Sequence, residues 1–173
     1  HGAAEPHALT DDEKMAGLAL FCCAQPRSDL TLEVREVGTS KDIPVKLLPC
    51  RVQEMHLAAP DVMVLKLKLP TNERLQFLAG QYVEFLLKDG QRRAFSIANA
   101  PHDDEMIELH VRHVPGGVFT EHVFHAMKSR EILRFEGPLG TFFLREDSPK
   151  PLIFIAGGTG FAPMKSVIEH AMH

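Results

Sequence analysis

The amino-acid sequence predicts a mainly β fold whose centre is a closed antiparallel barrel. Six or seven short segments between residues 45 and 144 alternate apolar and polar side chains, and glycine, proline and aspartate separate them. Within this stretch only residues 119–127 space their apolar side chains as a helix does. Many short strands with a single helix over about 100 residues are typical of a small closed barrel.

The expected barrel strands follow one another with short turns. Asp89-Gly90 is a hairpin signal that leads into a strand beginning near Arg92, and Pro115-Gly116-Gly117 ends the strand before the helix. Thr120 is the candidate cap of that helix. Besides the strand near Arg92, the expected strands cover residues 45–58, 61–69, 78–86, 106–114, 132–135 and 142–144.

The pattern changes after Pro149. Residues 152–156 form a continuous apolar run, as in a strand that is covered on both faces. A glycine-rich turn at residues 157–160 and a helical stretch at residues 164–173 follow. Strand, turn and helix are the opening unit of a nucleotide-binding α/β domain. One strand and one helix cannot build a doubly wound sheet, so we expect residues 150–173 to be the truncated start of such a domain.

The residues before the barrel predict a separate segment. Thr10 and Glu13 form a capping box for a short helix over residues 11–17. The glycine, serine, lysine and proline of the stretch before the barrel are typical of a linker. The predicted divisions are residues 1–36, a linker at 37–45, the barrel at 46–148 and the α/β start at 150–173.

The composition excludes several functional classes. A net charge of −4 and a pI near 6.2 argue against a nucleic-acid partner. The longest apolar runs, residues 16–24 and 152–156, are too short to span a bilayer, so we expect no membrane association. Cys22, Cys23 and Cys50 have no regular spacing, which favours a reducing compartment and a cytoplasmic location.

The ten histidines raise the question of a metal site. His110 and His113 are three apart on an expected strand, where they point to opposite faces. His122 and His125 can share a helix face, but no Cys or carboxylate at ligand spacing accompanies them. The spacings therefore do not favour a histidine-based site.

One stretch, Arg93-Ala94-Phe95-Ser96, combines a cation, an aromatic ring and a hydroxyl. A strand would direct Arg93 and Phe95 to one side and Ala94 and Ser96 to the other. A guanidinium suits a phosphate, and an aromatic ring suits a flat heterocycle. The glycines at 116–117 and 157–160 each precede a helix, an arrangement that also suits phosphate. Taken singly, these features equally describe an edge strand and two ordinary turns.

In combination, four ordered motifs resemble the ferredoxin–NADP⁺ reductase family. Arg93 to Ser96 resemble its R-x-Y-S flavin motif, with Phe95 in the place of the usual Tyr. Residues 117–120 (GVFT) resemble G-x-x-S/T, residues 137–142 (GPLGTF) resemble G-P-x-G-x-F, and residues 158–163 (GTGFAP) resemble G-T-G-x-A-P. The resemblance implies a FAD-binding barrel followed by a nicotinamide-nucleotide domain.

The resemblance also implies roles for individual residues. Arg93 would pair with the FAD diphosphate, Phe95 would pack on the isoalloxazine, and Ser96 would lie near flavin N5. Thr159 would lie between flavin and nicotinamide, so Ser96 and Thr159 are the implied catalytic residues. Because Phe lacks the hydroxyl of Tyr, one hydrogen bond to the ribityl chain would be lost. The implied cofactor-binding set is Arg93, Ala94, Phe95, Ser96, His110, Val111, Arg112, Gly116, Gly117, Val118, Thr120, Gly158, Thr159 and Gly160.

The N-terminal segment has a resemblance of its own. Residues 8–34 resemble the last third of a plant-type 2Fe–2S ferredoxin domain, in which the fourth cluster Cys lies four residues before a Pro. Cys22 stands four residues before Pro26 and is the implied metal ligand, with Cys23 as its non-ligating neighbour. A plant-type cluster also needs a C-x4-C-x2-C run, which would precede His1. We therefore expect residues 1–36 to be the tail of a cluster domain, with the cluster only in a longer protein.

These resemblances imply a modular reductase that passes electrons from NAD(P)H through FAD and a 2Fe–2S cluster to a partner. The runs ERLQFLAGQY, LHVRHVPGG and RFEGPLGTFFLRED are most similar to the CDP-6-deoxyhexose (glucoseen) reductase group, and oxygenase reductases share this architecture. The expected partner is a redox protein or an enzyme-bound CDP-6-deoxyhexose intermediate. Alternatives are a reductase of free flavin or a small acceptor, and a non-catalytic FAD-binding barrel. We expect the 173-residue chain to bind FAD without a cluster spectrum or NAD(P)H oxidation.

Overall fold

The computed structural model describes residues 9–20, 25–31 and 43–173, and the chain divides into two compact units, residues 1–36 and 37–173. The first unit contains helix α1 (Asp11–Met15). Its predicted capping box is confirmed, since Thr10 Oγ1 accepts from Glu13 N (3.3 Å) and Glu13 Oε2 accepts from Thr10 N (2.8 Å). The helix ends before Gly17, whose φ of +82° suits the left-handed position after a helix. Cys22 and Cys23 lie outside the described residues.

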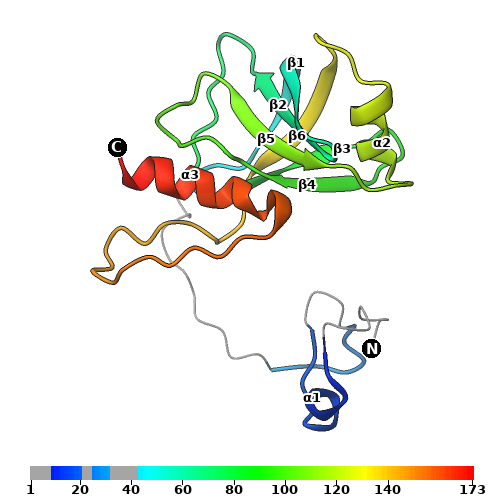
Figure 1. The fold of residues 1–173 in the computed structure, drawn as a ribbon, viewed down its shortest axis with the longest axis vertical. Coiled ribbons are helices and arrows are strands. Elements are labelled where there is room, and N and C mark those ends of the chain that lie inside the picture. The colour runs from blue at the N-terminus through cyan, green and yellow to red at the C-terminus, as the bar shows by residue number, and fades with distance from the viewer. Residues whose placement is uncertain (1–8, 21–24, 32–42) are drawn as a thin grey trace. The chain divides into compact units, whose positions relative to one another are not determined.

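The second unit is built on one six-stranded antiparallel sheet (Figure 1). Its strands lie in the order β4-β3-β6-β1-β2-β5, so β4 and β5 are the two edges. Two helices accompany the sheet, with α2 at one end and α3 beside β5 (Figure 1). The elements are β1 (Lys46–Ala59), β2 (Val62–Lys68), β3 (Tyr82–Leu86), β4 (Arg92–Ser96), β5 (Ile107–Arg112), α2 (Val118–His125), β6 (Ile132–Leu139), the short 3-10 helix η2 (Gly158–Gly160) and α3 (Phe161–Ala171).

The prediction of a mainly β antiparallel fold is confirmed, but the sheet is open rather than closed. Its edges meet at a single bridge between Ile97 and Leu109, next to which Ala98 N donates to Glu108 O (2.8 Å). Strand β4 is only five residues long and ends at Ser96, so only the residues just after it reach β5. No continuous ladder therefore joins β4 to β5 among the described residues.

The core lies on the inner face of the curved sheet and is closed at one end by α2. The fully buried side chains include Leu65, Leu109 and Val83, as strand alternation predicts. Phe119 of α2 stacks on Phe85 with 5.0 Å between ring centroids. Each large apolar side chain buried in this way contributes about 1.5–3 kcal/mol. The helix thus completes a core that the open sheet alone would leave exposed.

Two predicted strands are absent from the described residues. Residues 142–144 make one backbone hydrogen bond, from Leu144 N to Ala79 O (3.4 Å), and form no strand. Residues 152–156 form no strand and pair with none, and Ile153 and Ile155 are each 86% exposed. A parallel strand forms only when neighbouring strands accept and donate its hydrogen bonds. The described chain places no such neighbours beside it.

Helix α3 begins earlier than the predicted 164–173 stretch. It starts at Phe161, so Pro163 lies in the first turn, where its missing N–H costs nothing. Ser166, which has no exposed surface, donates from Oγ to the carbonyl oxygen of Asn99 (2.7 Å). No helix in the described residues is both long enough and apolar enough to cross a membrane.

Candidate functional site

The Arg93–Ser96 stretch forms most of edge strand β4. It pairs with β3 so that Arg93 lies opposite Phe85 and Phe95 lies opposite Val83. Phe85 and Val83 point into the core, so Arg93 and Phe95 share the inner side of the sheet edge. Ala94 and Ser96 point to the other side, as strand alternation predicts.

Two adjacent arginines on β4 have different surroundings. Arg92 contacts the carboxylates of Glu84 (3.3 Å) and Glu136, so its charge is neutralised. Arg93 donates only to neutral oxygens, the carbonyl of Arg92 (2.8 Å) and Oε1 of Gln91. Among the described residues no carboxylate pairs with Arg93, so its charge remains available to an anionic ligand.

Phe95 connects β4 to helix α2. Its ring lies 5.2 Å from that of Phe119 and 5.9 Å from that of Phe85, at tilts of 43° and 58°. Part of the Phe95 surface is therefore used in packing, and the ring is only half-buried. The contact brings the Arg93–Ser96 stretch beside the glycine turn that precedes α2.

The turn at Gly116-Gly117 has the geometry of an anion cradle. Gly116 has a φ of +76°, which favours glycine. A Cβ on Gly117 would lie 2.7 Å from Oγ1 of Thr120 and 3.0 Å from the carbonyl oxygen of Val114, so the turn admits no side chain there. In this structure the carboxylate of Glu121 accepts a hydrogen bond from Gly116 N (2.9 Å). That hydrogen bond is the main cause that lowers the pKa of Glu121, and it shows that the amide presents itself to an anion.

The prediction that Thr120 caps α2 is wrong. Gly117 is the N-cap residue, and no side chain caps the helix. Thr120 Oγ1 instead accepts from Val114 N (3.1 Å) and donates to Val114 O (2.9 Å). These two hydrogen bonds connect α2 to the residue that precedes the glycine turn. The amides at the start of α2 are consequently left without a side-chain partner.

Strand β5 presents Glu108, His110 and Arg112 on its outer face, whereas Val111 is buried. Because β5 is a sheet edge, the backbone of residues 110–112 pairs only with β2 among the described strands. The hydrogen bond from His110 Nε2 (3.0 Å), with the charge of Lys165, lowers the pKa of Glu108 to about 2. This carboxylate is ionised throughout the physiological range.

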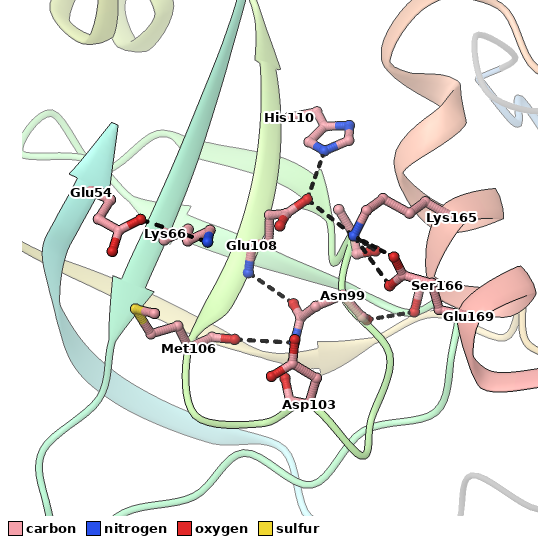
Figure 2. Close-up of polar contacts among 11 residues, drawn as sticks. Glu54, Lys66, Asn99, Asp103, Met106, Glu108, His110, Lys165, Ser166 and Glu169 are labelled. Carbon is pink, nitrogen blue, oxygen red and sulfur yellow. Dashed lines mark hydrogen bonds and ion pairs between the residues drawn. The ribbon is translucent and has the colours of Figure 1, made fainter. Parts of the chain in front are cut away.

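Figure 2 shows how that carboxylate joins β5 to α3. Lys165 Nζ lies 3.3 Å from Glu108 Oε1 and 2.9 Å from Glu169 Oε1. Burial alone would lower the pKa of Lys165, but its contacts with the two carboxylates outweigh burial and raise it. Asn99 supports the same region, since its Oδ1 accepts from Glu108 N (2.8 Å).

The docking of α3 brings the second glycine turn to the end of β5. A Cβ on Gly158 would lie 3.6 Å from Nη1 of Arg112. Thr159 is half-buried, and Gly160 is exposed before the first turn of α3. The structure therefore brings β4 together with the turn before α2, and β5 with the turn before α3. The bridge between Ile97 and Leu109 joins the two groups.

The other motif of the sequence, residues 137–142, has a packing role in this structure. A Cβ on Gly140 would lie 2.8 Å from the ring of Tyr82, and Gln81 Nε2 donates to the carbonyl oxygen of Gly140 (3.0 Å). Phe142 packs in the same way against Gly80.

Sequence reasoning missed one cluster of polar side chains. His113, Glu121 and His125 each bring one ligand-type atom within 4.8 Å of the others. The spacing of four between Glu121 and His125 was a usable signal for a shared helix face. The approach of His113 depends on the turn between β5 and α2, which the spacing did not reveal.

Comparison with known proteins identifies the family of this chain and several relatives. The sequence model of the family described as "Oxidoreductase FAD-binding domain" matches residues 49–144. The CDP-6-deoxy-L-threo-D-glycero-4-hexulose-3-dehydrase reductase of Yersinia pseudotuberculosis is 44% identical over 167 residues, which are 96% of this chain and 50% of that protein. Reductase component 1 of the terephthalate 1,2-dioxygenase of Comamonas sp. is 43% identical over 150 residues, which are 87% of this chain and 44% of that protein.

Among solved structures, an Amycolatopsis cytochrome P450 reductase is 38% identical and superposes with a TM-score of 0.69. The match covers 97% of this chain and 51% of that reductase. The chain thus spans about half the length of the relatives it matches.

Proposed function

This chain belongs to the ferredoxin reductase family of FAD-binding oxidoreductase domains, and we propose that it is the flavin-holding part of an NAD(P)H-dependent reductase. The contact between Phe95 and Phe119 carries the proposal. This contact joins the strand of Arg93, which pairs with no carboxylate among the described residues, to the first turn of α2. That turn follows a glycine whose amide already binds a carboxylate. Both groups suit the diphosphate of FAD.

The protein's contribution is to bind and orient the cofactor. Arg93 and the amides of Gly116 and Val118 would hold the diphosphate, with Gly117, whose own amide donates to Val114 O (2.9 Å), letting the backbone approach it closely. The free edge of residues 110–112 would follow the flavin chain. Ala94 and Ser96 lie together on the outer side of β4, where Ser96 would face the flavin ring. FAD, when bound, accepts a hydride from the nicotinamide and releases the electrons singly.

The second glycine turn is proposed to receive the nicotinamide nucleotide. Gly158, Thr159 and Gly160 precede α3, and Arg112 lies next to them. Ser166, Lys165 and Asn99 hold α3 against β5. This docking would keep Thr159 at a constant position relative to the flavin, and position is what hydride transfer requires of the protein.

In the longer protein we propose that electrons continue to a 2Fe–2S cluster, with Cys22 as one ligand, and then to a partner. The relatives suggest two kinds of acceptor, an oxygenase component or an enzyme that holds a CDP-6-deoxyhexulose intermediate. The identities to the two relatives are nearly equal, but the match to the Yersinia reductase extends over 96% of the chain against 87% for the dioxygenase component, which favours the sugar-nucleotide system. Turnover with each purified acceptor would distinguish the two.

Flavin binding is tested by titrating FAD into the chain and into Arg93→Ala, with the bound fraction read from flavin fluorescence. Loss of one charge-assisted contact of about 1.5–3 kcal/mol predicts a roughly 10- to 150-fold weaker affinity. Arg92→Ala is the matched control, because its side chain is paired with Glu84 and Glu136. Equal affinity of Arg93→Ala and the unmodified chain would overturn the assignment.

A further inference from the structure

Three side chains beside the glycine turn form a set of metal-ligand type. His113 follows β5, while Glu121 and His125 project from α2. His113 Nε2 lies 3.2 Å from Glu121 Oε1, and His125 Nε2 lies 3.2 Å from Glu121 Oε2. The two imidazole rings are perpendicular, with 5.4 Å between their centroids.

The fold holds these three side chains before any ligand arrives. Glu121 and His125 are four residues apart and therefore share one face of α2. Glu121 is further fixed by the hydrogen bond from Gly116 N. His113 is anchored through its backbone N–H, which donates to Asp61 O (2.8 Å), and its ring packs at 4.8 Å from that of Phe124.

The Nε2 atom of His113 has no exposed surface and no hydrogen-bond partner. Glu121 Oε1 is near it, but not in the direction that a hydrogen bond requires. A buried polar atom without a partner is unfavourable, and such atoms in native proteins are usually satisfied by a water or an ion. Ligand-type atoms of Glu121 and His125 both lie within 4.8 Å of the ligand-type atom of His113.

We propose that His113, Glu121 and His125 bind a divalent transition-metal ion, with Zn²⁺ as the best fit. Two imidazoles and one carboxylate are a zinc ligand set, and three protein ligands leave the fourth position for water or another ligand. Bonds of about 2.0–2.1 Å in tetrahedral geometry place ligand atoms about 3.3 Å apart. Each imidazole nitrogen lies 3.2 Å from a carboxylate oxygen, but from different oxygens of Glu121, so this side chain must turn to bring one oxygen to both. The side chain of His125 is 65% exposed, so it can adjust to complete the geometry.

The site is distinct from the flavin proposal but touches it at one point, because Gly116 N, which is assigned to the diphosphate, donates to Glu121 in this structure. It needs no nucleotide, and none of its three side chains is assigned to FAD. The competing explanation is that the two histidines only neutralise Glu121 at the surface of α2. Metal affinity separates the two explanations, because an ion-pair cluster has no need for all three groups to converge on one point.

The test is a titration of Zn²⁺ against a chromophoric competitor. The chain carries Cys22→Ser and Cys23→Ser, because thiolates would otherwise compete for zinc. We expect about one equivalent to bind with micromolar affinity, and His125→Ala and Glu121→Gln to weaken binding at least about tenfold. His122→Ala is the matched control, since His122 lies on the same helix but pairs with Glu131 (2.6 Å).

The location of the ion is checked by anomalous scattering from crystals soaked in Zn²⁺, with circular dichroism to confirm that each variant folds. A peak between His113, Glu121 and His125 is expected. The proposal is overturned if the chain with Cys22→Ser and Cys23→Ser binds no zinc, if His125→Ala and Glu121→Gln in that background bind as tightly as His122→Ala, or if the anomalous peak lies elsewhere.

Discussion

The hydroxyl of Ser166 donates a 2.7 Å hydrogen bond to the carbonyl oxygen of Asn99, and both residues are at most 2% exposed. This contact joins α3 to the loop between β4 and β5. The side chain of the same Asn99 donates to the carbonyls of Asp103 (2.6 Å) and Met106 (3.0 Å). Asn99 thus holds the loop before β5 with its side chain and binds α3, the helix after the second glycine turn, with its backbone carbonyl (Figure 2).

Replacement of Ser166 by Ala is expected to lower the free energy of unfolding by about 1–3 kcal/mol, because the carbonyl of Asn99 would be left buried without its donor. Urea denaturation measures this change. Ser129→Ala is the control, since Ser129 is exposed and lies 3.5 Å from its acceptor, the carbonyl of Gln53. Equal stability of the two variants would contradict the docking role of Ser166.

Stability should depend on Glu108 in the acid range. Its pKa is lowered to about 2, first by the hydrogen bond from His110 and also by the charge of Lys165, so the folded state favours the ionised form. The stabilisation is therefore present above the unfolded pKa near 4.5 and is lost as the pH falls toward 2. With allowance for solvent screening we expect about 1–2 kcal/mol.

The measurement is the free energy of unfolding of the unmodified chain and of Glu108→Gln as a function of pH. The unmodified chain should be more stable at neutral pH, and the difference should shrink as the solution is acidified. A difference that does not change with pH would show that the charge of Glu108 is not the cause.

Gly117→Ala is expected to disrupt the turn before α2. The new Cβ would lie 2.7 Å from Thr120 Oγ1 and 3.0 Å from Val114 O, and the backbone oxygen cannot move aside freely. We expect a loss of about 1–3 kcal/mol in stability and weaker FAD binding. Gly157→Ala is the control, because a Cβ there meets no atom within 4 Å. If both variants matched the unmodified chain in melting temperature and flavin affinity, the turn would not need glycine at 117.

Cys50 is expected to be unreactive in the folded protein. It is 2% exposed, and burial raises the pKa of its thiol to about 12, so almost no thiolate forms at mildly alkaline pH. Alkylation followed by peptide mass spectrometry should label Cys50 only after addition of concentrated guanidinium chloride. Rapid labelling without denaturant would mean that β1 separates from β6 in the native state, since Cys50 pairs with Leu133 there.

Much of the candidate site could be predicted from the sequence, because its motifs are local. Strand alternation predicted that Arg93 and Phe95 lie on one side of a strand. The glycines indicated turns in which a side chain would clash with neighbouring atoms. Local pattern did not distinguish Arg93 from Arg92 as the residue that pairs with no carboxylate in the described part of the chain. That distinction depends on Glu84 and Glu136, which β3 and β6 bring beside Arg92.

The order of the strands from β1 to β6, the α1 capping box and the order of the glycine turns followed from the sequence alone, because each depends on neighbours along the chain. Tertiary structure decided what depends on distant partners. Residues 152–156 have the composition of a buried strand yet stay unpaired, since hydrogen bonds of a strand must come from other strands. Distant partners also decided that the sheet stays open between β4 and β5. They decided that Thr120 bonds Val114 instead of capping α2, and that His113 lies close to Glu121 and His125.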